Sequence, residues 1–299
     1  MTSALRTVVD SVRARRRSAL RKRLLKEFEN SGRRPWAPGY LVFREDLLRG
    51  ALADEALIAT FAGGGRLPPG YGAGIDERIV EYPWLVSVAG KGRVRALDAG
   101  SALNHDFILE QPRFAEKELH IVTLAPEPNL FTERGVSYVY SDLRCLPYRS
   151  GWFDEIYSIS TLEHVGMDNS LYLADGADTC RSDPNGVLDA ARELSRVTRP
   201  GGTISFTVPF GRYADLGWYQ QFDSASLDTM IEAFGAKARN EAFFRYTADG
   251  WQRSTREECA DVEGCDVQRT KYFDPASTRD FDADRAAGSR AVAAIRLWM

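Results

Sequence analysis

Acidic side chains and a glycine directly follow short apolar runs in the middle of this chain of 299 residues. Asp98 and Gly100 come after the run that begins at Val94, and Asp142 comes after the run at 137–140. A glycine at a strand end lets the backbone turn tightly beside a ligand, and a carboxylate there can accept hydrogen bonds from ammonium or hydroxyl groups. The pattern indicates a small-molecule site, with a turn glycine and a capping aspartate as the structural alternative.

A histidine and two aromatic loop segments are the other candidates for chemistry. His164 lies in the segment after the apolar run at 155–159, and an imidazole with its usual pKa near neutrality suits a general base. Arg212, Tyr213 and Tyr219 follow the run at 203–208, and aromatic rings mixed with polar side chains in a loop would suit a polar ring compound as substrate. The alternative for these aromatic residues is a lid packed on the core.

Metal ligands and a membrane span are not expected. The three histidines and four cysteines form no C-x-x-C pair and fall at no spacing typical of a zinc site. No apolar run approaches the roughly 18 to 20 residues of a membrane span, and the start of the chain lacks the features of a secretory signal. We expect a reduced, cytoplasmic, soluble protein without a metal.

The elements that would position the candidate residues alternate in type. Short apolar runs separated by helical or loop segments are typical of a parallel sheet with crossover helices. A helix is expected over 187–197, and a second one is expected to follow Asp223 and to stop at Gly235. Strands are expected near 94–97, 120–124, 137–140, 155–159, 203–208, 241–246 and 291–298.

Five motifs occur in order between about 76 and 235. They are D-x-G at Asp98, D-L-x-x-L-P at Asp142, F-D at Phe153, T-L-E-H-V at Thr161 and R-V-x-x-P-G-G at Arg196. At these residues the chain resembles the class I S-adenosylmethionine-dependent methyltransferases, especially their small-molecule, type 11-like branch. The resemblance implies a Rossmann-like, doubly wound α/β sheet of seven strands, mostly parallel with one antiparallel strand, plus an N-terminal helical extension.

The resemblance also implies S-adenosylmethionine as the cofactor, bound at the carboxyl ends of the strands. Asp142 and the Leu143 backbone would face the adenine, and Ser160 would lie beside the sulfonium. In the same branch the Glu-His pair often braces the start of a helix, which is the alternative to a catalytic His164. The methionine and ribose end would be lined by Asp98, Gly100, Ser101 and Asn104.

Two departures from the family pattern affect this site. The turn after the first strand holds fewer glycines than is usual in the family. The acidic residue that usually ends the second strand and holds the ribose hydroxyls is missing from 123–126. Glu127 is the nearest carboxylate and is our candidate replacement, with an exposed loop residue as the alternative.

Charge divides the chain into a basic head and an acidic body. Residues 1–34 hold 11 of the 39 Lys and Arg and 3 of the 42 Asp and Glu, a net charge of +8, which leaves −11 for the remainder. Nucleic acid is therefore a poor partner for the body. We expect a basic amphipathic helix at 1–34 for docking on a subunit, a partner protein or a membrane surface, a lid-like helical extension at 35–75 and the methyltransferase domain at 76–299.

The expected reaction transfers a methyl group to an oxygen, or as a second choice a nitrogen, of a polar small molecule. A sugar, or a precursor in glycan or secondary-metabolite assembly, is the first candidate acceptor. A nicotinamide-dependent oxidoreductase, which would have the same doubly wound arrangement of strands and helices, is the first alternative. The absence of the dinucleotide-binding motif G-x-G-x-x-G from the chain weighs against it. A non-catalytic binding protein with the same fold is the second alternative.

Overall fold

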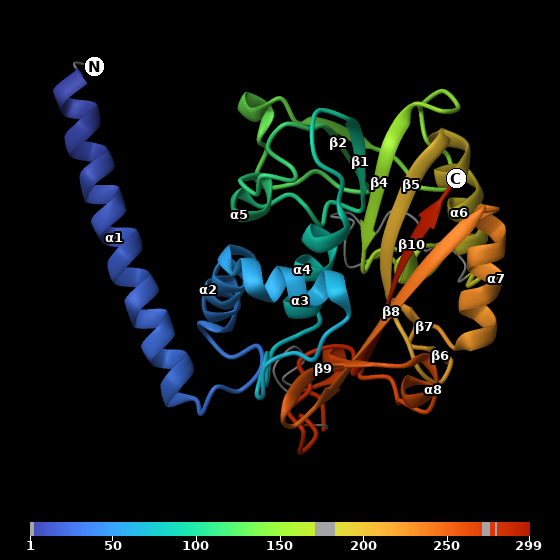
Figure 1. Cartoon of the computed structure of the whole chain (residues 1–299). Helices are drawn as coiled ribbons and strands as arrows, with labels where there is room; N and C mark the ends of the chain where they lie inside the picture. Colours follow the sequence, from blue (N-terminus) through green and yellow to red (C-terminus); the bar gives the residue numbers. More distant parts are fainter. Residues whose placement is uncertain (1–2, 171–182, 271–275, 279) are drawn as a thin grey trace.

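The central feature of the computed structural model is a twisted eight-stranded sheet with helices on both faces (Figure 1). The structure describes residues 3–170, 183–270, 276–278 and 280–299. The strand order is β3-β2-β1-β4-β5-β10-β8-β9. Strands β1 (Arg95–Ala99), β2 (Glu118–Thr123), β3 (Ser137–Tyr140), β4 (Phe153–Ile159) and β5 (Thr198–Pro209) are parallel to one another.

The last strand of the chain reverses the direction of the sheet. β10 (Ala291–Trp298) lies antiparallel between β5 and β8 (Ala238–Thr247), with Ile295 opposite both Phe206 and Glu241. β9 (Gly250–Ser254) then pairs with β8 as the outer strand of a hairpin. The first seven strands in this order form the expected mostly parallel sheet with one antiparallel strand, and β9 is the additional strand that the sequence did not predict.

Alternating residues along the strands belong to two separate hydrophobic cores, because successive side chains of a strand point to opposite faces of the sheet. On β1, Ala96 belongs to the core beneath α4 (Arg78–Val88), whereas Leu97 belongs to the core beneath α6 (Gly186–Val197) and α7 (Ser224–Phe234). Both faces of the sheet carry apolar side chains, because helices cover each face. This double burial explains why the strands appear in the sequence as continuous apolar runs.

The boundaries of α7 follow directly from its capping residues. The Asp223 carboxylate accepts from the Ser226 backbone N–H at 2.8 Å, and the Ser226 hydroxyl completes a capping box. The helix ends at Gly235, whose φ of 65° suits a glycine. The predictions of this helix and of the helix over 187–197 are confirmed.

Two helices of the N-terminal extension pack on α4 and share its core. α2 (Tyr40–Ala53) and α3 (Glu55–Gly63) bury Leu48, Leu57 and Phe61 on this side of the sheet. The remaining described elements are the helices α5 (Asp106–Leu109) and α8 (Arg256–Cys259), the 3-10 turns Thr132–Arg134, Leu162–His164 and Val267–Arg269, and the short ribbon of β6 (Ala214–Asp215) and β7 (Gln220–Gln221).

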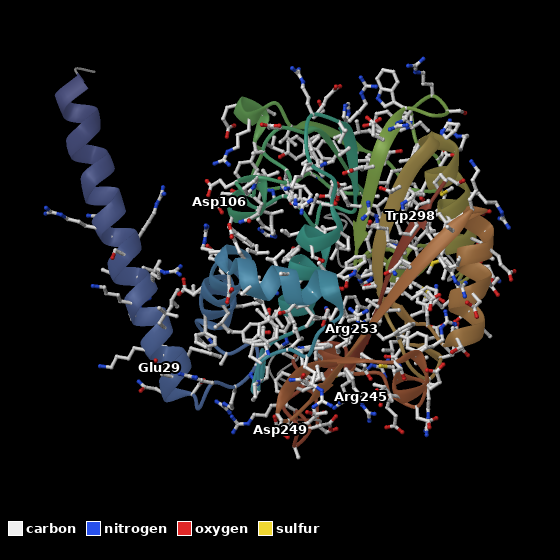
Figure 2. The ribbon with its side chains drawn as sticks, viewed as in Figure 1. Glu29, Asp106, Arg245, Asp249, Arg253 and Trp298 are labelled. Carbon is white, nitrogen blue, oxygen red and sulfur yellow. The ribbon has the colours of Figure 1, made fainter. Side chains whose placement is uncertain are left out.

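The basic helix α1 (Ser3–Asn30) projects away from the body (Figure 1). Figure 2 shows that its side chains approach the body toward the end of the helix where Glu29 is labelled. Phe28 is 1% exposed and packs on Tyr40 and Phe43, with ring centroids 5.9 and 5.1 Å away. Docking of the basic part on a membrane or a partner stays a prediction, and in the described part of the chain no helix is long and apolar enough to cross a membrane.

Removing the Phe28 ring should loosen the base of α1. We expect Phe28→Ala to lower the free energy of unfolding by about 3 kcal/mol, because it leaves a cavity between α1 and α2. Leu20→Ala is the matched control on the same helix, since Leu20 is 47% exposed, and it should change stability by less than about 0.5 kcal/mol. Urea unfolding measures both, and equal effects would contradict a docked helix base.

Candidate functional site

A cavity of about 700 Å³ opens at the carboxyl ends of β1, β2, β3 and β4. The chain order changes direction between the neighbouring strands β1 and β4, which is where open α/β sheets bind ligands. Its size falls in the range of small-molecule sites. The strand ends contribute Gly100, Ser101, Ala102, Val122, Thr123, Leu124, Ala125, Pro126, Glu127, Ser141, Asp142, Leu143, Arg144, Ile159, Ser160 and Thr161 to the wall.

Asp98 lies behind the loop that lines the cavity. Its carboxylate is fully buried, and Oδ2 accepts from the Leu103 backbone N–H at 2.7 Å. Burial raises the pKa of Asp98 to about 7, against the hydrogen bonds from the loop backbone that favour its charged form. Among the described residues, Asp98 Oδ1 and the nearby Ser101 Oγ have no hydrogen-bond partner, although both are buried. Such atoms usually pair with a ligand or a water molecule.

Contacts within the protein require a glycine at position 100. Its φ is 123°, and a Cβ placed there would lie 2.0 Å from Thr161 Oγ1 in the segment after β4. Ser101 has a φ of 69°, which is uncommon for a residue with a side chain and is typical of strained functional loops. The loop after β1 is therefore tightly held against the segment after β4.

Asn104 joins two loops through its side-chain hydrogen bonds. Its Nδ2 donates to the Asn129 carbonyl at 3.0 Å, and its Oδ1 accepts from the Tyr138 hydroxyl at 2.8 Å. Asn104 is not part of the cavity wall. It holds the loop that carries Glu127, instead of facing the cavity itself.

Asp142 and Leu143 line the opposite end of the cavity from the loop after β1. Both oxygens of Asp142 accept from Arg144, with Nη2 at 2.7 Å and the backbone N–H at 2.8 Å. Partial burial raises the pKa of Asp142, but these hydrogen bonds outweigh it and lower the pKa below its usual value. Glu127 also lies on the cavity wall, after β2.

A buried carboxylate on α4 connects three parts of the site. Glu81 is fully buried, and its Oε1 accepts from the hydroxyls of Ser160 at 2.5 Å and Thr207 at 2.6 Å. Its Oε2 accepts from Arg78 Nη1 at 2.6 Å. Ser160, at the end of β4, has a φ of 40°, so this carboxylate stabilises an unusual backbone conformation on the cavity wall.

His164 lines the cavity with its imidazole largely buried. Nδ1 lies 2.8 Å from the Trp218 carbonyl oxygen, so the proton is on Nδ1. Burial lowers the pKa of His164 to about 4, although the hydrogen bond to Trp218 favours the protonated form. The neighbouring Glu163 is buried as well, and burial raises its pKa well above the usual value. At neutral pH the imidazole of His164 is therefore uncharged.

The three predicted substrate residues lie outside the cavity wall. Arg212 is largely exposed and pairs with Glu263 at 3.3 Å, and Tyr213 is 46% exposed. Tyr219 is buried behind His164, with ring centroids 6.0 Å apart, and its hydroxyl donates to the Cys265 carbonyl. The loops after β5 thus support the cavity wall through Trp218 and Tyr219 and do not form it. For Tyr219, the alternative of a lid packed on the core describes the structure better than a role in substrate binding.

The sequence did not identify the part of the wall that lies before β1 in the chain. It consists of Trp36 and Arg44 from the extension and of Arg78 and Tyr82 from α4. One signal was present: the pair Arg78 and Glu81 interrupts an otherwise apolar stretch that becomes a buried helix. A charged pair in such a stretch indicates a paired, buried site.

No protein-family model and no curated protein matches the chain. The YcgJ protein from Bacillus subtilis is 15% identical over 73% of this chain and 97% of its own, with a TM-score of 0.44. The [4+2]-cyclase SpnF is 17% identical over 81% of this chain and 91% of its own (TM-score 0.45). The 1,6-didemethyltoxoflavin-N1-methyltransferase from Burkholderia thailandensis, solved with S-adenosylhomocysteine, is 15% identical over 87% and 88% (TM-score 0.43).

The strand order of the sheet establishes the fold by itself. It is the predicted Rossmann-like, doubly wound sheet, mostly parallel with the antiparallel strand β10, so the predicted fold class is confirmed. The difference is the eighth strand, β9, on the outer edge.

Breaking the Glu81 contacts should destabilise the domain. Glu81→Gln keeps an oxygen for Ser160 and Thr207 but removes the charge that faces Arg78. We expect a loss of about 3 kcal/mol in the free energy of unfolding, because a largely buried guanidinium loses its partner. Glu45→Gln is the control, since Glu45 forms a half-exposed pair with Arg49 on α2, and it should cost less than about 1 kcal/mol in urea unfolding. Losses of equal size would contradict the role of Glu81.

The protonation state of His164 can be observed directly, because the chain has only three histidines. We expect nitrogen NMR to show a neutral His164 with the proton on Nδ1 at neutral pH, titrating near a pKa of about 4. His164→Asn identifies the signal by its disappearance. Titration at the ordinary value near 6.5 would contradict the buried, carbonyl-bound geometry.

Proposed function

We propose that this protein is an S-adenosylmethionine-dependent methyltransferase that acts on an oxygen, or as a second choice a nitrogen, of a polar small molecule. The observation that carries the proposal is the cavity at the β1–β4 switch point, whose walls come from the segments that also carry the sequence motifs. A sugar or a related precursor in glycan or secondary-metabolite assembly remains our first candidate for the acceptor.

The residues present suit this cofactor. The unpartnered Asp98 Oδ1 and Ser101 Oγ could accept hydrogen bonds from the methionine end. Glu127 could accept from the ribose hydroxyls, and Asp142 with the Leu143 backbone could face the adenine. Since Asn104 is committed to Asn129 and Tyr138, its contribution would be to position the loop. When bound, S-adenosylmethionine supplies an electrophilic methyl group.

The protein's part in the reaction would be to position the acceptor and to keep water out. Ser160, held by Glu81, shapes the wall next to the segment that carries Thr161 and His164. His164 lies on the same wall, with the proton on Nδ1 held by the Trp218 carbonyl. A pKa of about 4 makes His164 a weak base, so positioning would contribute more to the rate than proton removal.

Calorimetric titration separates the proposed function from its rivals. We expect S-adenosylhomocysteine to bind and NAD not to bind, because the loop after β1 lacks the G-x-G-x-x-G that holds a pyrophosphate. Binding of NAD alone would favour an oxidoreductase, and no binding of S-adenosylhomocysteine would reject the proposal. S-adenosylhomocysteine binding without turnover on any acceptor would favour the non-catalytic alternative.

The affinity for S-adenosylhomocysteine should depend on the proton of Asp98. The pKa of Asp98 is raised to about 7 by burial, so the carboxylate that would accept from the ligand is charged only above that pH. We expect binding to tighten by about tenfold from about pH 6 to about pH 8.

Asp98→Asn is the matched variant, because its amide oxygen can still accept from the Leu103 N–H. It should bind about tenfold more weakly at about pH 8 and without this pH dependence. Burial also raises the pKa of Glu77 to about 7. If the pH dependence persists in Asp98→Asn and vanishes in Glu77→Gln, the assignment to Asp98 is wrong.

A further inference from the structure

Two guanidinium groups from α2 and α4 lie on the cavity wall. Arg44 extends from α2 and Arg78 from α4, and their side chains are 22% and 23% exposed. Both guanidiniums help to lower the pKa of His105, after burial as the main cause, and both act on the hydroxyl of Tyr82. The centroid of the Tyr82 ring lies 6.0 Å from Arg78 Cζ and 6.4 Å from the centroid of the His105 ring, and Arg44 lines the same cavity.

Each guanidinium is held from behind by a buried carboxylate. Arg44 Nη1 donates to Asp76 Oδ2 at 2.5 Å, and Arg78 Nη1 donates to Glu81 Oε2 at 2.6 Å. Asp76 is fixed in turn by the Tyr40 hydroxyl at 3.1 Å, and Glu81 by Ser160 and Thr207. Within the described residues these are the hydrogen bonds that the two guanidiniums make, although a guanidinium has five N–H donors. The remaining donors are thus preoriented on a partly open wall.

From this geometry we propose that Arg44 and Arg78 bind an oxyanion, a carboxylate or phosphate, of the methyl acceptor. A preoriented arginine fork matches the paired oxygens of such groups. The centroid of the Trp36 ring lies 6.0 Å from Arg44 Cζ, and the centroid of the Tyr82 ring lies 6.0 Å from Arg78 Cζ. The two rings offer flat surfaces for the body of the acceptor. The inference rests on the proposed function and narrows its substrate class to anionic small molecules.

The charges in the cavity favour an anionic acceptor, and not the carboxylate of the cofactor alone, as the partner of the two arginines. S-adenosylmethionine brings a single carboxylate, which can occupy at most one of the two forks. Its sulfonium would also add positive charge to a cavity that already holds both guanidiniums. An anionic acceptor would instead meet the donors of both guanidiniums that Asp76 and Glu81 leave unused.

The test uses the full chain loaded with S-adenosylhomocysteine, titrated calorimetrically with benzoate and with inorganic phosphate. Benzamide, the neutral counterpart of benzoate, is the matched control ligand. We expect at least one anion to bind about tenfold or more tightly than benzamide. Preference for benzoate indicates a carboxylate on the acceptor, and preference for phosphate indicates a phosphoryl group. If neither anion binds more tightly than benzamide, the inference is wrong, whereas a failure of S-adenosylhomocysteine to bind rejects the proposed function itself.

Arginine variants assign the anion site. Arg44→Gln and Arg78→Gln should each weaken anion binding about tenfold and leave the affinity for S-adenosylhomocysteine unchanged, which also shows that the variants are folded. Arg44→Lys keeps the charge without the planar fork and should lose less. Should Arg78→Gln destabilise the protein by exposing Glu81 to an uncharged partner, Arg44→Gln and Arg44→Lys still decide the question, and unchanged anion binding in both overturns the proposal.

A second comparison excludes the cofactor's own carboxylate as the partner of both arginines. 5′-Methylthioadenosine lacks the amino acid part of S-adenosylhomocysteine. If both arginine variants weaken S-adenosylhomocysteine but not 5′-methylthioadenosine, and anion binding is unaffected, the arginines serve the cofactor and the proposal fails.

Discussion

The buried carboxylate of Glu81 is the interaction on which the site depends. It ties α4 to the ends of two neighbouring strands through Ser160 and Thr207, and it holds Arg78 at the cavity wall. An unpaired carboxylate in this place would be costly, so its three donors must be present together. Because α2 packs on α4, the position of α2, which brings Arg44 to the cavity wall, depends on this contact.

Burial also decides the charges in the cavity. Burial raises the pKa of Asp98 and of Glu163 and lowers the pKa of His164, because the interior disfavours their charged forms. Arg44 and Arg78 keep their charge because each has its own carboxylate behind it. The net acidity of the body therefore does not describe the part of the wall that α2 and α4 contribute, where the charged groups are Arg44 and Arg78. This local reversal is the basis for inferring an anionic acceptor.

The loops after β5 and the helix α1 show two different uses of surface segments. Trp218 and Tyr219 pack behind His164 and fix its tautomer and place, so their role is to support the wall. α1 is anchored by Phe28 at one end and projects from the body beyond it (Figure 1). The proposed cofactor site lies in the body, so the basic helix can serve docking without changing that site.

The sequence by itself determined the sheet, the two marked helices and the strand ends that line the cavity, because strand burial on both faces and helix capping are local patterns in the chain. It also determined that Glu127, Asp142, Leu143, Ser160 and His164 lie on one cavity, since parallel strands bring their carboxyl ends to one edge. Only the tertiary structure decided that Asn104 is committed to Asn129 and Tyr138, that Tyr219 packs on His164, and that Trp36 and Arg44 line the cavity. These outcomes depend on contacts between residues far apart in the chain, such as Glu81 with Thr207, and no local pattern records which distant partner a side chain will meet.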